Sequence, residues 1–452
     1  MAAASAAAGG ARTTVTDSSA PVTTKDFSFL LRPEIYHQIS PLSIPAPFRT
    51  PTRQPAPETP ISDLLAQGHF RAAAIAAVQA LTSSPVSITQ AAAHPPVEPT
   101  DHARVFSLLY TRLSCLCLID AVALAAQEAK ALEDLNSAFY LDPMTGTHLV
   151  PWELRLLAVR LQTLGFGDPR RAVVSYFELA RDARTEIGKA LRARDHSAAE
   201  MWKERLADLG VKVAGALVEQ EDLLGAAEHL ATLKDIGGGG RAAERLAMSK
   251  ALLWLHIGDV EQARRCIRSS SRGAGEHVKS GVAERGLNAL ADMADAEYEK
   301  SLQGWMALKQ LLDSQDSDEG SSEVSDEMIG VNLAVCLLYV GRIEEVSRLI
   351  PSQFSCPVGS EWPADNMPSS TSQGRQILES LVSNANYSSH TLLFNLSTMY
   401  ELCTDRAKAL KLQLAERVAS RAPATVRDDE TSGGGFTAAR QGWEKTNADF
   451  KL

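Results

Sequence analysis

Apolar residues recur along much of this chain at spacings of three and four, and small turn-forming residues interrupt them. Leu252 and Leu255 precede Gly258, and a similar apolar run precedes Gly341. This spacing places the apolar side chains on one face of an α-helix, and glycine often ends helices because it adopts left-handed backbone conformations freely. The pattern therefore predicts amphipathic helices that are separated by tight turns.

The turns share a second feature, which is a small or apolar residue five positions after the turn residue. Such a residue allows the second helix of a hairpin to approach the first closely. The spacing is found in the pairs Gly167 and Ala172, Asp222 and Ala227, Gly258 and Ala263, Ala296 and Ser301, and Gly341 and Val346. Helical hairpins that repeat about every 34 residues are tetratricopeptide repeats, which stack because one hairpin cannot bury its own apolar face. We therefore expect an all-α, tetratricopeptide-like solenoid of helical hairpins with a disordered N-terminal arm and loop insertions.

Shifts in composition divide the chain into regions. Prolines crowd residues 41–60 and favour extended backbone, after which Ser62 or Asp63 is a predicted N-cap. Gly68 and Ala73 repeat the turn spacing, and a hairpin over 105–135 is expected to turn near Asp120. The predicted regions are a disordered Ala- and Pro-rich arm (1–60), N-terminal helical hairpins (61–147), tetratricopeptide-like repeats (148–350) with an acidic loop (313–327), a Pro- and Ser-rich insertion (351–374), C-terminal capping helices (375–420) and a polar tail (421–452).

Composition favours helices, and no segment predicts membrane insertion or secretion. The chain is 45% apolar but only 6% aromatic, so alanine and leucine are expected to build its core. The longest apolar run, 116–126, is interrupted by Asp120 and falls short of the roughly 18 residues that a membrane span needs. The first 26 residues lack the apolar core of a secretory signal, and the isolated Arg12 gives little support for a mitochondrial address. We expect a cytoplasmic protein without a transmembrane segment.

The formal net charge of −10 is concentrated in one place. Residues 313–327 hold seven acidic side chains and no basic one, which indicates a solvated insertion; a docking or phosphorylation segment is the alternative. No basic stripe with interleaved aromatic residues is present, and an acidic surface repels phosphate backbones. The sequence therefore argues against nucleic-acid binding.

No motif for catalysis, metal binding or cofactor binding is found. The six cysteines, at 115, 117, 266, 336, 356 and 403, include no Cys-x-x-Cys pair, and the ten histidines include no His-Glu-x-x-His pair. The glycine run at 237–240 is not followed by the Lys-Ser/Thr of a phosphate loop, and no Gly-x-Ser-x-Gly elbow occurs. We expect a protein that is not an enzyme and has no cofactor.

Three blocks go beyond a generic repeat. They are residues 149–157 (LVPWELRLL), 331–341 (VNLAVCLLYVG) and 391–402 (TLLFNLSTMYEL). Together they resemble the family of trafficking protein particle (TRAPP) complex subunit 12. The resemblance implies a tetratricopeptide subunit of a vesicle-tethering complex that acts between the endoplasmic reticulum and the Golgi and in autophagy. It implies other TRAPP subunits as direct partners, a Rab GTPase as an indirect one through the complex, and peripheral association with Golgi membranes.

Five residues are candidates for partner contacts. The apolar residues of the arm either pack on the first hairpin of the chain or anchor a partner, and the other candidates are a groove position and an exposed position of the cap. The candidates are Phe27, Phe29, Leu31, Asn332 and Glu401. The alternative function is an adaptor that docks a chaperone or the peptide tail of another protein, which requires a basic, Asn-bearing groove. Asn332 occupies such a groove position, whereas Val213 and Ser249 stand at the equivalent places.

Overall fold

The computed structural model describes eleven stretches of the chain. They are residues 25–50, 54–56, 58–82, 97–233, 241–271, 278–313, 323–340, 370–383, 388–403, 405–420 and 442–452. These stretches are helical apart from turns, loops and one isolated bridge between Leu141 and His148. The expected all-α class is confirmed.

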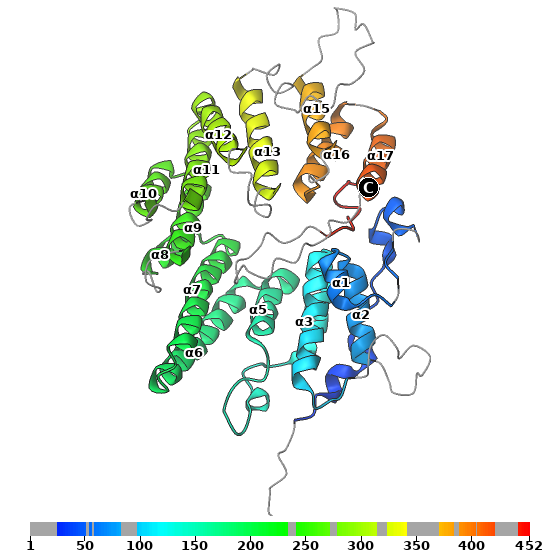
Figure 1. Cartoon of the computed structure of the whole chain (residues 1–452), viewed down its shortest axis with the longest axis vertical. Helices are drawn as coiled ribbons and strands as arrows, with labels where there is room; N and C mark the ends of the chain where they lie inside the picture. Colours follow the sequence, from blue (N-terminus) through cyan, green and yellow to red (C-terminus); the bar gives the residue numbers. More distant parts are fainter. Residues whose placement is uncertain are drawn as a thin grey trace, which may run out of the picture.

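The helices follow one another around the molecule as successive neighbours (Figure 1). The first group is α1 (Ile61–Ala66), α2 (Phe70–Thr82), α3 (His102–Leu118), α4 (Val122–Ala129), α5 (Trp152–Phe166), α6 (Pro169–Arg192), α7 (His196–Glu219) and α8 (Leu223–Thr232). The second group is α9 (Arg241–Ile257), α10 (Val260–Ser271), α11 (Val278–Ala294), α12 (Tyr298–Asp313), α13 (Glu323–Val340), α15 (Ser370–Ser383), α16 (His390–Cys403) and α17 (Ala407–Ala419). Each helix packs mainly on the next, which makes the molecule a solenoid of helix pairs.

One turn geometry recurs between these helices. A residue with positive φ ends one helix, and five positions later a small side chain is buried where the next helix crosses it. The pairs are Gly68 and Ala73, Asp120 and Ala125, Gly167 and Ala172, Arg194 and Ala199, Glu221 and Ala226, Gly258 and Ala263, and Ala296 and Ser301. The predicted spacing is thus confirmed at Gly68, Gly167, Gly258 and Ala296, and it recurs at Asp120 and Arg194, where only the first turn was expected.

At the turn between α7 and α8 the predicted register was wrong by one residue. Glu221, not Asp222, has the positive φ, and the fully buried small residue is Ala226. The reason is that Asp222 is the N-cap of α8, where its carboxylate accepts a hydrogen bond from the N–H of Gly225. The same Asp cap follows the turn residue at positions 168, 195 and 259.

Other boundaries differ from the sequence expectation. Helix α1 starts at Ile61 after Pro60, one or two residues before the predicted N-cap. The last residues of the acidic run belong to α13, which starts at Glu323, and α15 starts at Ser370 inside the predicted insertion. The remaining turn, Gly341 with Val346, lies outside the described residues, as do 314–322 and 341–369.

The expected disorder of the N-terminal arm was wrong for residues 25–50. These residues form four short 3-10 helices, η1 (Ser28–Leu31), η2 (Pro33–Ile35), η3 (Pro41–Ser43) and η4 (Ala46–Arg49), which pack along the helices. The prolines favour such short turns, and apolar side chains between them enter two cores. Phe27 and Leu30 join the core of α3–α5, whereas Ile44 and Phe48 join the core of α16 and α17.

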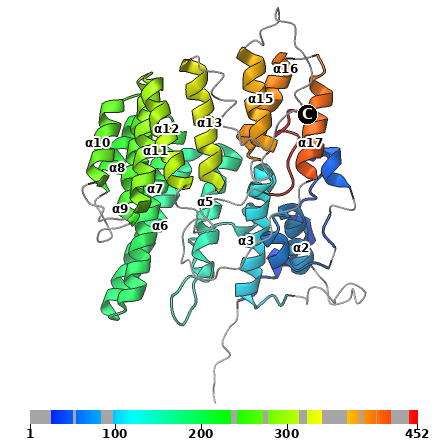
Figure 2. The same ribbon diagram turned by 45° about the horizontal axis from the view of Figure 1, so that its top comes forward.

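The tail was expected to be polar, but its last residues carry buried apolar side chains and contact both ends of the solenoid. Residues 442–452 lie between α17, the arm and the α1–α2 turn (Figures 1 and 2). Phe450 is fully buried in the same core as Phe48 and Leu414. The chain therefore closes into a ring, in which α17 follows α16 in sequence and lies beside η4 in space.

Candidate interaction surfaces

The first candidate surface is the start of the arm, where Phe27, Phe29 and Leu31 lie together on η1 and its N-cap. The ring of Phe27 is fully buried, 5.0 Å from the ring of Phe106 on α3. Phe29 and Leu31 are partly buried against the same core. Of the two possibilities left open by the sequence, the structure shows the arm packed on the chain itself, and a partner could reach Phe27 only by displacing the arm.

A buried ion pair fixes the middle of the arm. The guanidinium of Arg112 on α3 donates to both carboxylate oxygens of Glu128 on α4, at 2.9 and 2.7 Å, and both side chains are almost fully buried. The arm completes the network through the backbone of His37. Its N–H donates to the Glu128 carboxylate, and the carbonyl of His37 accepts from the Arg112 guanidinium. Burial raises the pKa of the neighbouring Tyr36 hydroxyl, and the Glu128 charge raises it further. The arm is therefore part of the folded core.

The second candidate surface is the α13 face, which we define as Met328, Asn332 and Tyr339. The adjoining side of α13 is buried against α11, α12 and α15 by Ile329, Leu333 and Cys336. Met328 is 46% exposed and Tyr339 is 67% exposed. The ring of Tyr339 stacks on that of Tyr298 from α12, with centroids 4.3 Å apart. The face therefore exposes two large apolar side chains, Met328 and Tyr339, on either side of the Asn332 amide.

Asn332 takes a local role on this face. Its side-chain amide donates to the carbonyl of Met328 one turn earlier, at 3.0 Å. Helix α13 itself contains no lysine or arginine. The adaptor alternative requires a basic group that binds a terminal carboxylate, and this helix does not supply one.

The third candidate surface is the cap, where Glu401 lies on α16. Its carboxylate is half exposed and accepts hydrogen bonds from the ammonium groups of Lys411 at 2.5 Å and Lys451 at 2.6 Å. The hydrogen bond from Lys411, followed by that from Lys451, lowers the pKa of Glu401 below its usual range. The expected free surface position is instead a bridge between α16, α17 and the C-terminal segment.

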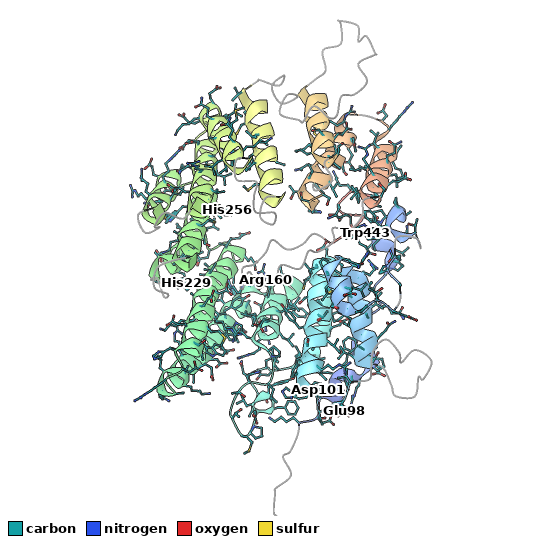
Figure 3. The ribbon with its side chains drawn as sticks, viewed as in Figure 1. Glu98, Asp101, Arg160, His229, His256 and Trp443 are labelled. Atoms are coloured by element: carbon teal, nitrogen blue, oxygen red, sulfur yellow. The ribbon has the colours of Figure 1, made fainter. Side chains whose placement is uncertain are left out.

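The structure does not bring these candidates together into one site. The arm residues contact α3, Asn332 lies on α13, and Glu401 lies on α16 at the opposite end of the sequence. What sequence reasoning missed is the C-terminal segment, which we define as residues 442–452 and which is labelled in Figure 3 at Trp443. The signal was present, because Trp443 and Phe450 are large apolar residues in an otherwise polar tail.

No described helix is long and apolar enough to cross a bilayer. Among the described residues, no group of three His, Cys, Asp or Glu side chains is placed to hold a metal ion. Burial raises the pKa of the Cys115 thiol to about 12, so this cysteine is a protonated core residue.

Comparison with known proteins adds no argument about fold or function. No family model and no curated protein matches the chain. Among solved structures, the chain is similar to the one titled crystal structure of P58(IPK) TPR domain, with 13% identity over 79% of this chain and 95% of that one. The TM-score is 0.18, so nothing further is concluded from this likeness. The architecture seen here is of the repeat type, whose stacked helix pairs form extended surfaces for binding other proteins.

Proposed function

We propose that this chain is a non-catalytic scaffold that binds other proteins through the α13 face. A helix that buries one apolar side and also exposes large apolar side chains, as α13 does with Met328 and Tyr339, is typical of a helix that meets a partner. Tyr339 is the observation that carries the proposal, because a tyrosine held by stacking on Tyr298 presents a rigid, largely exposed ring. Such rings dominate protein interfaces, since they contribute contact area at little cost in conformational entropy.

The finer proposal is that the scaffold is a subunit of a TRAPP-type tether, with other TRAPP subunits as partners and a Rab GTPase reached through them. Its support is the sequence resemblance, carried by residues 149–157, 331–341 and 391–402. These blocks fall on different helices, α5, α13 and α16. The second block includes Asn332 and Tyr339 of the α13 face. On this proposal the chain works in traffic between the endoplasmic reticulum and the Golgi and in autophagy, at the membrane only through its complex.

Affinity purification of the tagged full chain tests both levels of the proposal. Met328→Glu and Tyr339→Glu place a charge on the α13 face, whereas Met144→Glu is a matched control at a residue that is 82% exposed elsewhere. We expect wild type and the control to recover the same proteins, TRAPP subunits among them, and the two α13 variants to lose some. Recovery of protein partners without any TRAPP subunit would contradict the finer proposal only. Identical recovery by all four chains would contradict the role of the α13 face.

The alternative, an adaptor for a chaperone or a peptide tail, is tested by a direct binding measurement. Fluorescent peptides with an acidic C-terminus are titrated against the wild-type chain and against Asn332→Ala. The adaptor function predicts saturable binding that Asn332→Ala weakens. We expect no binding, because the Asn332 amide is engaged within its own helix and α13 supplies no basic group.

A further inference from the structure

The C-terminal segment docks on the rest of the chain through backbone hydrogen bonds. The N–H of Trp443 donates to the carbonyl of Gly68 at 3.1 Å, and the N–H of Asn447 donates to the carbonyl of Ser43 at 2.7 Å. The side-chain amide of Asn447 donates in addition to the carbonyl of Leu42 at 2.8 Å. The segment therefore forms hydrogen bonds with backbone carbonyls of both the arm and the α1–α2 turn.

Two aromatic side chains anchor the segment. Phe450 is fully buried between the arm and the cap helices, with its ring 6.2 Å from that of Phe48. The ring of Trp443 lies 5.5 Å from that of Phe48 and 5.0 Å from that of His69. Burial lowers the pKa of His69, so its neutral ring forms one wall of the tryptophan contact. Buried aromatic anchors of this kind supply most of the binding energy in protein–peptide contacts.

Polar and charged side chains surround these anchors and pair with two helices, α2 and α16. Glu444 pairs with Arg71 of α2 at 3.2 Å, and Asp449 pairs with His390 of α16 at 2.6 Å. Lys451 reaches Glu401 of α16. Apolar anchors surrounded by paired charges are the anatomy of an interface between two molecules.

The segment also holds its own shape. The carboxylate of Asp449 accepts hydrogen bonds from the N–H and the hydroxyl of Thr446, and the N–H of Leu452 donates to the carbonyl of Asn447. These bonds form a turn within the segment itself. A preorganised peptide loses less conformational entropy when it binds, which favours binding as a separate unit.

We propose that the surface between the arm, the α1–α2 turn and helices α16–α17 is a peptide-binding groove, and that the C-terminal segment is its resident ligand, bound in cis and exchangeable. The ligand class is a short peptide with two aromatic anchors seven residues apart and an Asn and an Asp between them, as in Trp443–Phe450. Release of this peptide removes the contacts that join α16 and α17 through it to the α1–α2 turn, whereas the direct contact of η4 with α17 stays. The proposal does not depend on the TRAPP assignment.

The test uses the full chain with a protease site inserted between Gly434 and Gly435. The purified chain is cut, a fluorescent peptide of residues 441–452 is added, and fluorescence anisotropy reports its incorporation. We expect saturable incorporation of one peptide per chain after cutting and little incorporation before it. A peptide with Phe450→Ala should bind at least about tenfold more weakly, because the buried ring supplies the anchor. A scrambled peptide of the same composition is the matched control.

Thermal melting of the cut chain provides a second measurement. Exchangeable binding predicts that the melting temperature of the cut chain rises with the concentration of added peptide. The proposal is overturned if the cut segment stays with the chain through gel filtration and no labelled peptide enters. It is also overturned if the cut chain loses its folded structure and added peptide does not restore it, because the segment would then be an inseparable part of the core.

Discussion

At the scale of single residues, the fold depends on small side chains at the helix crossings. Seven turns bury a small side chain five positions after a positive-φ residue, and Ala263 is one of these, with no exposed surface. This relation was readable from sequence at the glycine turns, because glycine marks positive φ. It was hidden where Arg194 and Glu221 adopt the same conformation, since their side chains give no such signal.

Ala263→Leu should lower the free energy of unfolding by about 1–3 kcal/mol, because the larger side chain overpacks the α9–α10 crossing. Chemical denaturation measures the change. Ala123→Leu, at an exposed position on α4, is the matched control and should be close to neutral. Equal effects of the two substitutions would show that Ala263 is not at a close crossing.

Arg112→Ala should lower the free energy of unfolding by about 3–5 kcal/mol, because Glu128 is then left charged and buried without its partner. Arg160→Ala, which breaks the more exposed pair with Glu219, should cost at most about 1 kcal/mol. Replacing Arg112 by Met together with Glu128 by Leu should recover part of the loss. If it does not, the polar network does more than neutralise a buried charge.

The Asp292 carboxylate predicts a pH dependence of stability. Burial alone would raise its pKa, but the hydrogen bonds from Lys300 and Arg264 outweigh burial and lower the pKa below its usual value. The folded state then holds its proton more weakly than the unfolded state, so stability is present above the unfolded pKa of about 4 and is lost as the pH falls below it. The free energy of unfolding, measured by chemical denaturation at several pH values, should fall more steeply from pH 6 to pH 3 for wild type than for Asp292→Asn. An equal fall for both chains would contradict the ion pairing.

At the scale of elements, the arm shows where sequence reasoning reached its limit. Seven prolines in residues 41–60 correctly excluded long helices, yet the short 3-10 helices and their packing depend on partners hundreds of residues away. Local composition cannot reveal such contacts. The sequence did indicate Phe27, Phe29 and Leu31, because apolar side chains in a polar arm need a surface that covers them. In the structure the core of α3–α5 provides that surface.

Phe27→Ala should detach the start of the arm and destabilise the chain by about 3–5 kcal/mol, because the ring fills a closed aromatic core. Limited proteolysis followed by mass spectrometry should then show cleavage between Lys25 and Arg49. Leu42→Ala, at a residue that is 73% exposed in the same arm, should leave the arm protected. An arm that stays protected in Phe27→Ala would show that its other contacts, the Arg112–Glu128 network and the burial of Leu30 among them, hold it without this ring.

At the scale of the whole molecule, the sequence predicted the all-α repeat architecture but not its closure. Periodicity and turn spacing act within one helix pair, so they predict helices, crossings and stacking from α1 to α13. The C-terminal segment joins Asn447 with Ser43 of the arm and Glu444 with Arg71 of α2, and no local pattern encodes such a pairing. The candidate residues were likewise predicted one at a time, and the structure places them on separate surfaces.

The most direct test of this closed architecture is photo-crosslinking from the arm. A photoreactive phenylalanine analogue is placed at Leu42, whose backbone carbonyl accepts a hydrogen bond from Asn447 and whose side chain is exposed. Placement at the exposed Met144 is the control. After irradiation of the dilute full chain, we predict an adduct within one molecule that joins the arm to residues 442–452, and none from the control. An adduct between separate molecules, or no adduct to residues 442–452, would contradict the closed ring.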